Sequence, residues 1–294
     1  MNSDKLEQLL HLGQKIPHHP VSRFAGWVAD SRIPFLKNFI IKNFIRYYNV
    51  NMSEAAVSEG QLYPSFNSFF TRPLAQGARP VAGDEKTITS PADGQLSQFG
   101  NIEGEQLIQA KGKYFTVKAL LGSTLLDPTL QGEQCADQSP HFTNGKFATI
   151  YLSPKDYHRI HMPIDGTLTE MVYIPGKLFS VNARTARLED DLFARNERVV
   201  CYFDTAVGKV AVILVGAMIV ASMSTAWSGI LPPYKTVTRT VYPDGDITLK
   251  KGEEMGQFRL GSTVIMLFPQ NSMHWAAPLQ LGQSVKMGED VAGI

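Results

Sequence analysis

The sequence predicts an α+β protein in which a helical N-terminal segment sits on a β-rich core. Residues 1–50 combine excess positive charge with apolar residues at helical spacing. From about residue 85, short apolar runs alternate with turn dipeptides, as in sheet proteins. At 294 residues, with 44% apolar and 19% charged side chains, the chain can bury a sizeable core. We divide it into a helical segment, 1–62, and a core, 63–294.

Composition excludes several classes of protein. The 28 basic and 27 acidic side chains nearly cancel, which argues against a nucleic-acid-binding protein. Cys135 and Cys201 are too few for a disulfide framework or a four-cysteine zinc site, so a reducing compartment fits best. The strongly apolar run over 210–221 is too short to span a bilayer, and the N-terminus lacks a signal-peptide pattern. We therefore expect no integral membrane protein.

The N-terminal segment predicts a helix from Pro34 to Tyr48, because proline suits the first turn of a helix. Residues 1–50 carry seven Lys or Arg against three Asp or Glu, a net charge of +4. A basic, apolar helix is typical of a membrane interface, although on pattern alone packing against its own core is the more common case. The residues that would contact lipid are Trp27, Phe35, Leu36, Phe39, Ile40 and Phe44.

The rest of the chain predicts mainly strands and turns. We expect strands at 147–152, 199–203 and, fully buried, 210–221, with short helices or loops at 178–187 and 192–196. Asp93-Gly94 alone predicts a hairpin turn. Residues 249–255 and 285–291 echo one another, which suggests two hairpin-like turns in one β-rich unit.

Two histidines, His158 and His161, lie three residues apart within Ser153–Pro163. They could transfer protons, bind a metal or be structural. A metal would need a third ligand, and neither a His-Glu-x-x-His motif nor a cysteine pair supplies one, so we expect no metal site. Proton transfer is favoured over a purely structural role.

The tetrapeptide Leu-Gly-Ser-Thr occurs twice, at 121–124 and 260–263. Glycine before a serine leaves its carbonyl open to the hydroxyl, so the serine could convert the amide to an ester if a base and oxyanion donors were present. The first copy follows a helix-like stretch, where Gly122 is an ordinary C-cap. We interpret the first copy as structural and the second as reactive.

Taken together, the motifs resemble those of the proteobacterial-type, pyruvoyl-dependent phosphatidylserine decarboxylase family. The resemblance runs along nearly the whole chain, and the order and spacing of the motifs make it specific. The matching segments are Phe66–Leu74, Pro91–Gly94, Gln109–Gly112, Tyr151–Pro163, Leu192–Arg198, Lys251–Gly256 and Phe258–Val264.

The resemblance implies that the chain cleaves itself between Gly261 and Ser262. Ser262 would be the nucleophile, His161 its base, and Asp93 the residue that orients this histidine, in the manner of a catalytic triad. The resulting ester would undergo β-elimination to dehydroalanine, and hydrolysis with loss of ammonia would leave a pyruvoyl group as the covalent cofactor.

The resemblance also implies the mature enzyme. A β chain, 1–261, and an α chain, 262–294, would remain associated. Phosphatidylserine would form an imine with the pyruvoyl group, which takes up electrons as CO₂ leaves, and His158 would protonate the α-carbon to give phosphatidylethanolamine. The enzyme would lie peripherally on the cytoplasmic face of the bacterial inner membrane, bound to anionic lipid; a homo-oligomer is left open.

Three other functions stay open at this point. The chain could be a pyruvoyl decarboxylase of a soluble amino acid, which assays on free serine would reveal. It could be a non-catalytic lipid-binding relative, in which case it would stay uncleaved. A metal hydrolase that uses the two histidines is the least favoured, and stoichiometric zinc in the purified protein would expose it.

Overall fold

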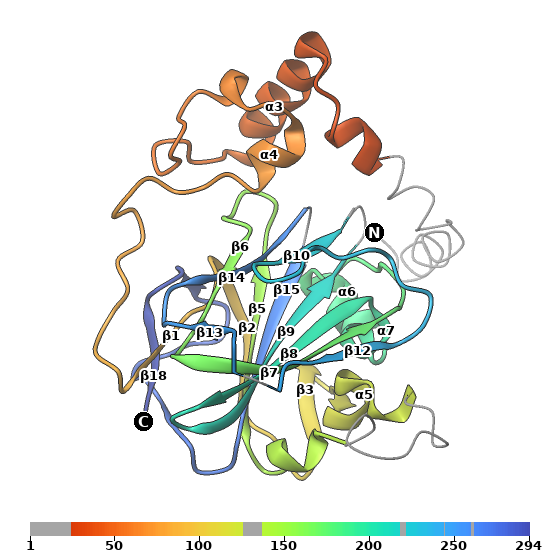
Figure 1. Ribbon diagram of the computed structural model, residues 1–294, viewed down its shortest axis with the longest axis vertical. Helices are drawn as coiled ribbons and strands as arrows, with labels where there is room; N and C mark the ends of the chain where they lie inside the picture. The colour runs from red at the N-terminus through yellow and green to blue at the C-terminus, as the bar shows by residue number, and fades with distance from the viewer. Residues whose placement is uncertain (1–24, 126–136, 218–221, 244, 260–261) are drawn as a thin grey trace.

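The computed structural model describes residues 25–125, 137–217, 222–243, 245–259 and 262–294. Within them, the core is a nine-stranded antiparallel sheet (Figure 1), which confirms the α+β class. In spatial order its strands are β12 (Thr238–Val241), β7 (Gly166–Ile174), β8 (Arg198–Thr205), β9 (Gly208–Gly216), β15 (Ser262–Phe268), β5 (Lys146–Leu152), β2 (Gly94–Asn101) and β17 (Ser284–Val285), with β13 (Thr248–Leu249) also paired to β7.

Strand β15 lies in the middle of this sheet, between β9 and β5, and all of its residues are buried. Its side chains alternate between two hydrophobic cores: Val264 and Met266 pack on one face, Ile265 and Leu267 on the other. Burial on both faces explains the continuous apolar runs of β15 and β9. The buried strand predicted over 210–221 is β9, although 218–221 lie outside the described residues.

Different elements cover the two faces of the sheet. The face of Val264 is covered by two small sheets, and the opposite face by a hairpin and short helices. The small sheets are β11 (Gly229–Ile230), β10 (Met223–Thr225), β14 (Glu254–Phe258) and β6 (Arg159–His161), and β1 (Thr87–Thr89), β18 (Asp290–Gly293) and β16 (His274–Trp275). The other cover is β3 (Gln106–Ala110), β4 (Lys113–Thr116), α5 (Val117–Leu121), α6 (Ala183–Leu188) and α7 (Leu192–Arg195).

The N-terminal helices form a separate cluster at one end of the molecule, beyond β6 (Figure 1). Helix α3 (Pro34–Tyr48) begins and ends as predicted, with proline in its first turn. Its buried residue Ile41 packs against helix α4 (Phe66–Phe70), whose aromatic side chains fill the cluster. The helical cluster therefore extends past the boundary that we predicted at residue 62.

The predicted echo between 249–255 and 285–291 is real in conformation. In both turns a lysine N–H is bonded to a glutamate three residues on, and a glycine, Gly252 or Gly288, has φ of 83° or 87°. The turns are not hairpins, because the flanking strands pair with other strands: β13 with β7, β14 with β6 and β10, β17 with β2, and β18 with β1 and β16.

The echo extends to a second motif, Pro-x-Asp-Gly, at 91–94 and 163–166. The two segments bond reciprocally, since His161 N donates to Pro91 O and Thr89 N to Pro163 O, each at 2.9 Å. The prediction of a hairpin turn at Asp93-Gly94 is wrong: β1 pairs with β18 and β2 pairs with β5, so the dipeptide joins two different sheets.

Candidate active site

The predicted catalytic residues approach one edge of the nine-stranded sheet, where β5 and β9 end and β2 and β15 begin. Ser262 pairs with Leu152, the last residue of β5. On the other side of β5, Gly94 packs so closely that a Cβ on it would lie 2.5 Å from Tyr151 O. Because neighbouring strands lie about 4.8 Å apart, the backbones at Asp93 and Ser262 are separated by roughly two strand spacings.

Ser262 is fully buried, and its Oγ has no hydrogen-bond partner among the described residues. By the alternation along β15, its side chain lies on the same face as Val264, the face covered by β6 and β14. A buried hydroxyl without a partner costs about 1–3 kcal/mol, so such a group calls for a functional explanation. Gly261, on the other side of the predicted cleavage bond, lies outside the described residues.

His158 is completely buried against the ring of Phe70, with the ring centroids 4.0 Å apart. Its Nδ1 lies 2.8 Å from Asp156 O, and because a carbonyl can only accept, Nδ1 carries the proton. Burial lowers the pKa of His158 to about 3, so the ring is neutral. Its Nε2 has no partner among the described residues and offers a free lone pair.

His161 is also buried and neutral in character, but both of its ring nitrogens are engaged. Nδ1 donates to Gly252 O at 2.8 Å, so Nε2 accepts from the Tyr157 hydroxyl at 2.9 Å. Burial lowers the pKa of His161 and raises the pKa of Tyr157. His161 is therefore held in the tautomer that a base needs, with Nε2 unprotonated.

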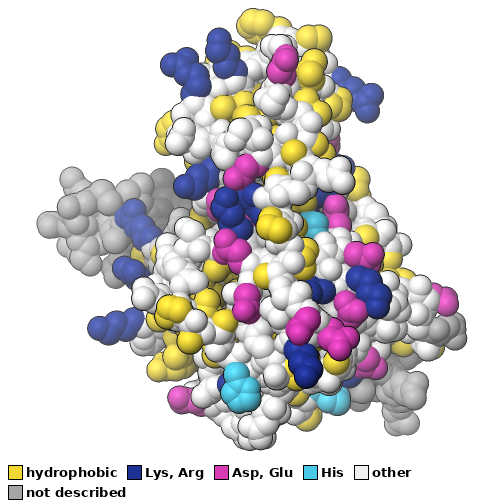
Figure 2. Space-filling view, turned by 90° about the vertical axis from the view of Figure 1, so that its left-hand side faces the viewer, with side chains coloured by type: hydrophobic (Ala, Val, Ile, Leu, Met, Phe, Trp, Pro, Cys, Tyr) yellow, Lys and Arg dark blue, Asp and Glu magenta, His cyan; other side chains and the backbone are white. Residues whose placement is uncertain are grey.

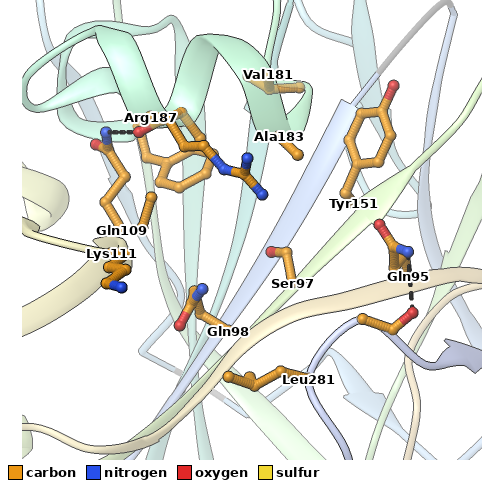
Figure 3. Close-up of a pocket in the computed structure, with 14 residues that line it drawn as sticks. Gln95, Ser97, Gln98, Gln109, Lys111, Tyr151, Val181, Ala183, Arg187 and Leu281 are labelled. Atoms are coloured by element: carbon orange, nitrogen blue, oxygen red, sulfur yellow. Dashed lines mark hydrogen bonds between the residues drawn. The ribbon is translucent and has the colours of Figure 1, made fainter.

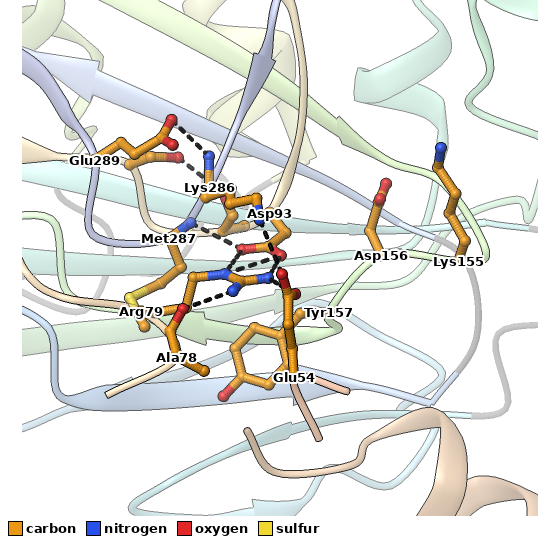
Figure 4. A network of polar contacts seen from close by, with 12 residues as sticks. Glu54, Ala78, Arg79, Asp93, Lys155, Asp156, Tyr157, Lys286, Met287 and Glu289 are labelled. Atoms are coloured by element: carbon orange, nitrogen blue, oxygen red, sulfur yellow. Dashed lines mark hydrogen bonds and ion pairs between the residues drawn. The ribbon is translucent and has the colours of Figure 1, made fainter. Parts of the chain in front are cut away.

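Asp93 lies in a network of ion pairs (Figure 4). Arg79 donates to both of its carboxylate oxygens, through Nε at 2.9 Å and Nη2 at 2.5 Å, and Met287 N donates at 2.9 Å. Arg79 also contacts Glu54 at 2.6 Å, and Lys286 contacts Glu54 at 3.0 Å. Glu54 lies between α3 and α4 in the chain, so this network joins the helical cluster to the core.

The predicted direct contact between Asp93 and His161 is not among the hydrogen bonds of the described residues. The two side chains contact different turns. Asp93 accepts a hydrogen bond from Met287 in the turn at 285–291, and His161 donates one to Gly252 in the turn at 249–255. Burial lowers the pKa of His161, and the charge of Asp93 raises it only weakly.

Arg79 and Tyr157 contact two of the predicted site residues, Asp93 and His161, and the sequence analysis did not single them out. Tyr157 lies directly before His158 in a matched motif, so its place in the motif was a usable signal. Nothing local marks Arg79, whose partner Asp93 is 14 positions away. Among the residues that the structure describes, no three His, Cys, Asp or Glu side chains gather as a metal site.

Cavities surround this edge of the sheet. One of about 200 Å³ lies between Arg72, Arg79, Asp93 and Asp156, and one of about 390 Å³ shares Asp93 and Asp156 with it. A third, of about 700 Å³, continues past Tyr151 on the opposite face of the sheet (Figure 3). The residues labelled there mix amides and hydroxyls with apolar side chains and the Arg187 guanidinium.

The predicted lipid-contacting residues divide into two groups. Trp27, Phe35 and Phe39 are 73%, 83% and 61% exposed. Phe44 is half-buried against the rings of α4, with its centroid 5.0 Å from that of Phe66, and Ile40 packs on the same cluster while Leu36 is half-buried. Figure 2 shows hydrophobic and basic side chains together over this end. No helix of the described chain is long and apolar enough to cross a bilayer.

Buried neutral histidines and a buried serine hydroxyl without a partner are typical of enzymes that use a serine nucleophile and transfer protons. Comparison with known proteins identifies the family. A sequence model described as phosphatidylserine decarboxylase matches residues 66–293, and one described as PSD matches residues 15–49. The chain therefore belongs to the phosphatidylserine decarboxylase family, as its motifs predicted.

Relatives match over nearly the whole chain. The phosphatidylserine decarboxylase proenzyme of Hahella chejuensis is 50% identical over 290 residues, 98% of this chain and 94% of the relative. The proenzyme of Bordetella avium is 52% identical over 278 residues, 94% of this chain and 91% of the relative. That of Yersinia enterocolitica is 47% identical over 289 residues, 96% and 95% of the two chains.

Proposed function

We propose that this chain is a decarboxylase proenzyme that converts phosphatidylserine to phosphatidylethanolamine after it cleaves itself before Ser262. The observation that carries the proposal is the fully buried Ser262 Oγ, which has no partner among the described residues. A hydroxyl left free in this way fits the precursor of a pyruvoyl group better than a structural serine, which would be hydrogen-bonded.

In the self-cleavage, Ser262 Oγ attacks the carbonyl carbon of the preceding residue and the amide becomes an ester. The proton leaves Oγ for a base and reaches the departing amine. His161 suits the role of base because Gly252 fixes its Nδ1 proton and leaves Nε2 as acceptor. The Tyr157 hydroxyl has to release His161 Nε2 before this nitrogen can accept the proton. Asp93, which is paired with Arg79, holds the turn at 285–291 through Met287 N.

The products are a β chain, 1–261, and an α chain, 262–294. Residue 262 keeps its neighbours after the cut, because β15 is bonded to β5 on one side and β9 on the other. This arrangement supports continued association of the two chains.

The pyruvoyl group supplies a carbonyl that reacts with an amine and accepts electrons when CO₂ leaves. His158 supplies the proton transfer. Its proton is on Nδ1, so the free Nε2 first takes a proton from the ammonium group of the headgroup, and later returns it to the α-carbon. The apolar surround, including Phe70, favours loss of the charged carboxylate.

The substrate lies in a bilayer, so the enzyme has to dock on a membrane surface. Trp27, Phe35 and Phe39 supply exposed apolar contact, and the exposed Lys42 and Arg46 supply attraction to anionic lipid. Peripheral binding at the cytoplasmic face of the inner membrane follows from this assignment. Ile40 and Phe44 are left out of the docking surface because they pack on α4.

The test is intact-mass analysis of freshly purified protein, before and after cyanoborohydride reduction in the presence of phosphatidylserine. We expect an α chain that begins at residue 262 with a pyruvoyl group in place of its amino terminus. On reduction this chain should gain the mass of one aminophospholipid less one oxygen atom, because the imine forms with loss of water and then takes up two hydrogen atoms. A single chain of full length that never gains lipid would refute the proposal.

A further inference from the structure

Arg72 is a buried cation at the junction between the helical cluster and the core. It lies two residues after the end of α4, is 4% exposed, and its guanidinium lies 5.5 Å from the centroid of the Phe69 ring. Its Nη2 donates to Lys155 O at 3.0 Å and Asp156 O at 3.4 Å. Its Nε and Nη1 have no partner among the described residues, although guanidinium nitrogens in proteins normally donate.

The charge of Arg72 is also unbalanced. Arg72 lines the cavity of about 200 Å³, where the carboxylates have other partners. Asp93 and Glu54 are paired with Arg79, and the Asp156 carboxylate accepts from Ser153 N and Oγ, each at 2.7 Å. Burial lowers the pKa of Arg72. A buried cation with two free donors beside a cavity is the arrangement that binds an anion.

The position of Arg72 relates this anion site to the reaction. Asp156 O accepts from both Arg72 Nη2 and His158 Nδ1, so the two side chains are anchored to one oxygen. Successive rings of α4 support them, Phe69 under Arg72 and Phe70 on His158. A ligand held by the free edge of Arg72 would therefore lie close to the segment that also holds His158, the residue that we propose transfers the proton.

We propose that Arg72 binds the phosphodiester of the lipid headgroup and so makes the site specific for a phospholipid over free serine. The headgroup offers two anions, but the carboxylate is the one that must lose its charge as CO₂ leaves. An arginine on the carboxylate would stabilise the ground state more than the transition state and slow the reaction. The phosphodiester keeps its charge throughout, so binding it positions the headgroup without that cost.

This inference rests on the proposed reaction at residue 262, and the experiment keeps the two separate. We compare Arg72→Gln with the wild type and with a matched control, Arg159→Gln. Arg159 lies beside α4 too, donating to Thr71 O, but its charge is already paired with Glu254 at 2.7 Å. Processing of each variant is followed by intact mass, which reports folding and self-cleavage without any substrate.

Two measurements test the anion site. In mixed micelles, Arg72→Gln is expected to raise the KM for phosphatidylserine, as surface mole fraction, roughly tenfold or more, with kcat changed less than about threefold. In calorimetric titrations of processed and Ser262→Ala protein, sn-glycero-3-phosphoethanolamine is expected to bind about tenfold more weakly to Arg72→Gln, while serine binding is unchanged. Arg159→Gln is expected to leave both ligands as in the wild type.

Loss of serine binding instead of diester binding would overturn the assignment in favour of the carboxylate. A fall in kcat at unchanged KM would also overturn it, since Arg72 would then only support the turn that holds His158. If Arg72→Gln fails to process, the same titrations are done with Arg72→Lys, which keeps the charge but loses the paired donors of the guanidinium. Affinity for the diester equal to that of the wild type would then overturn the proposal. Diester binding to the Ser262→Ala chain is independent of the pyruvoyl assignment.

Discussion

The two copies of Leu-Gly-Ser-Thr lie in different places in the fold, and only the second has the surroundings of the self-cleaving serine that we propose. In the first copy Gly122, with φ of 77°, ends α5, and Ser123 Oγ donates to Asp137 at 2.6 Å. In the second, described from Ser262 onward, the serine begins a central strand, is fully buried and has an unpartnered Oγ. The tetrapeptide is the same, so the two serines differ in burial and in whether Oγ has a hydrogen-bond partner.

The largest expected effect separates these two serines. Ser262→Ala removes the nucleophile, so we expect no cleavage and no decarboxylation. Ser123→Ala removes only a hydrogen bond at the surface, and we expect cleavage at the wild-type rate. Intact mass over time measures both. Residual cleavage in Ser262→Ala, or an equal loss in the two variants, would contradict the distinction.

The two Pro-x-Asp-Gly segments give a second pair. Asp93 is buried and paired with Arg79, while Asp165 pairs with Lys250 at the surface, with the aspartate side chain 52% exposed. We expect Asp93→Asn to slow self-cleavage roughly 100-fold or more, because it leaves Arg79 short of a partner and loosens the site. Asp165→Asn should change the rate less than about twofold, since surface ion pairs contribute little. Similar rates for the two variants would remove Asp93 from the site.

The buried histidine His158 gives the chain a stability that depends on pH. The pKa of His158 is about 3 in the fold and about 6.5 when unfolded. Between these values the unfolded chain binds the extra proton, so stability is full above about pH 6.5 and falls by up to about 1.4 kcal/mol for each unit below it.

Urea unfolding of the single-chain Ser262→Ala protein at pH 7 and pH 5.5 measures this slope. His158→Gln should lower this slope by about 0.6 proton on average, because the histidine of the unfolded chain is only partly protonated near pH 7. An unchanged slope in His158→Gln would mean that the buried ring is not neutral at these pH values.

The smallest expected effect distinguishes two residues of α3, the exposed Phe39 and the half-buried Phe44. Phe39→Ser should weaken binding to anionic vesicles roughly tenfold without changing stability, because Phe39 is exposed. Phe44→Ser should instead lower the free energy of unfolding by about 3 kcal/mol, since its ring packs on Phe66, Phe69 and Phe70. Vesicle sedimentation and urea unfolding check the two outcomes. Equal loss of vesicle binding in both variants would mean that α3 docks as a whole.

Local signals predicted the elements well. Proline at 34 and the apolar runs of β5, β8 and β9 depend only on neighbours in the chain, and these elements lie close to where we expected them. The predicted lipid-contacting stripe was only partly predictable. Periodicity indicates an apolar face, but not that Ile40 and Phe44 pack against another helix, α4.

The sequence predicted candidate residues for the site, but it could not predict their contacts. The motifs indicated Asp93, His158, His161 and Ser262, through their resemblance to a family. Their partners depend on segments far apart in the chain, such as Met287 for Asp93 and Gly252 for His161. A sequence pattern has no information on such pairings, which explains why a direct Asp93–His161 contact was expected and a pair of equivalent turns was found.

The central position of β15 in the sheet also affects whether the mature protein can refold after it unfolds. Before the cut, β15 and its two neighbours belong to one chain, and unfolding can reverse within a single molecule. After the cut that we propose before Ser262, a short fragment that supplies a middle strand would have to be recaptured from solution. Recovery would then depend on concentration and compete with aggregation of the exposed strands. We therefore expect the uncut chain to refold reversibly, whereas the lifetime of the cleaved protein would be set by the rate at which it unfolds.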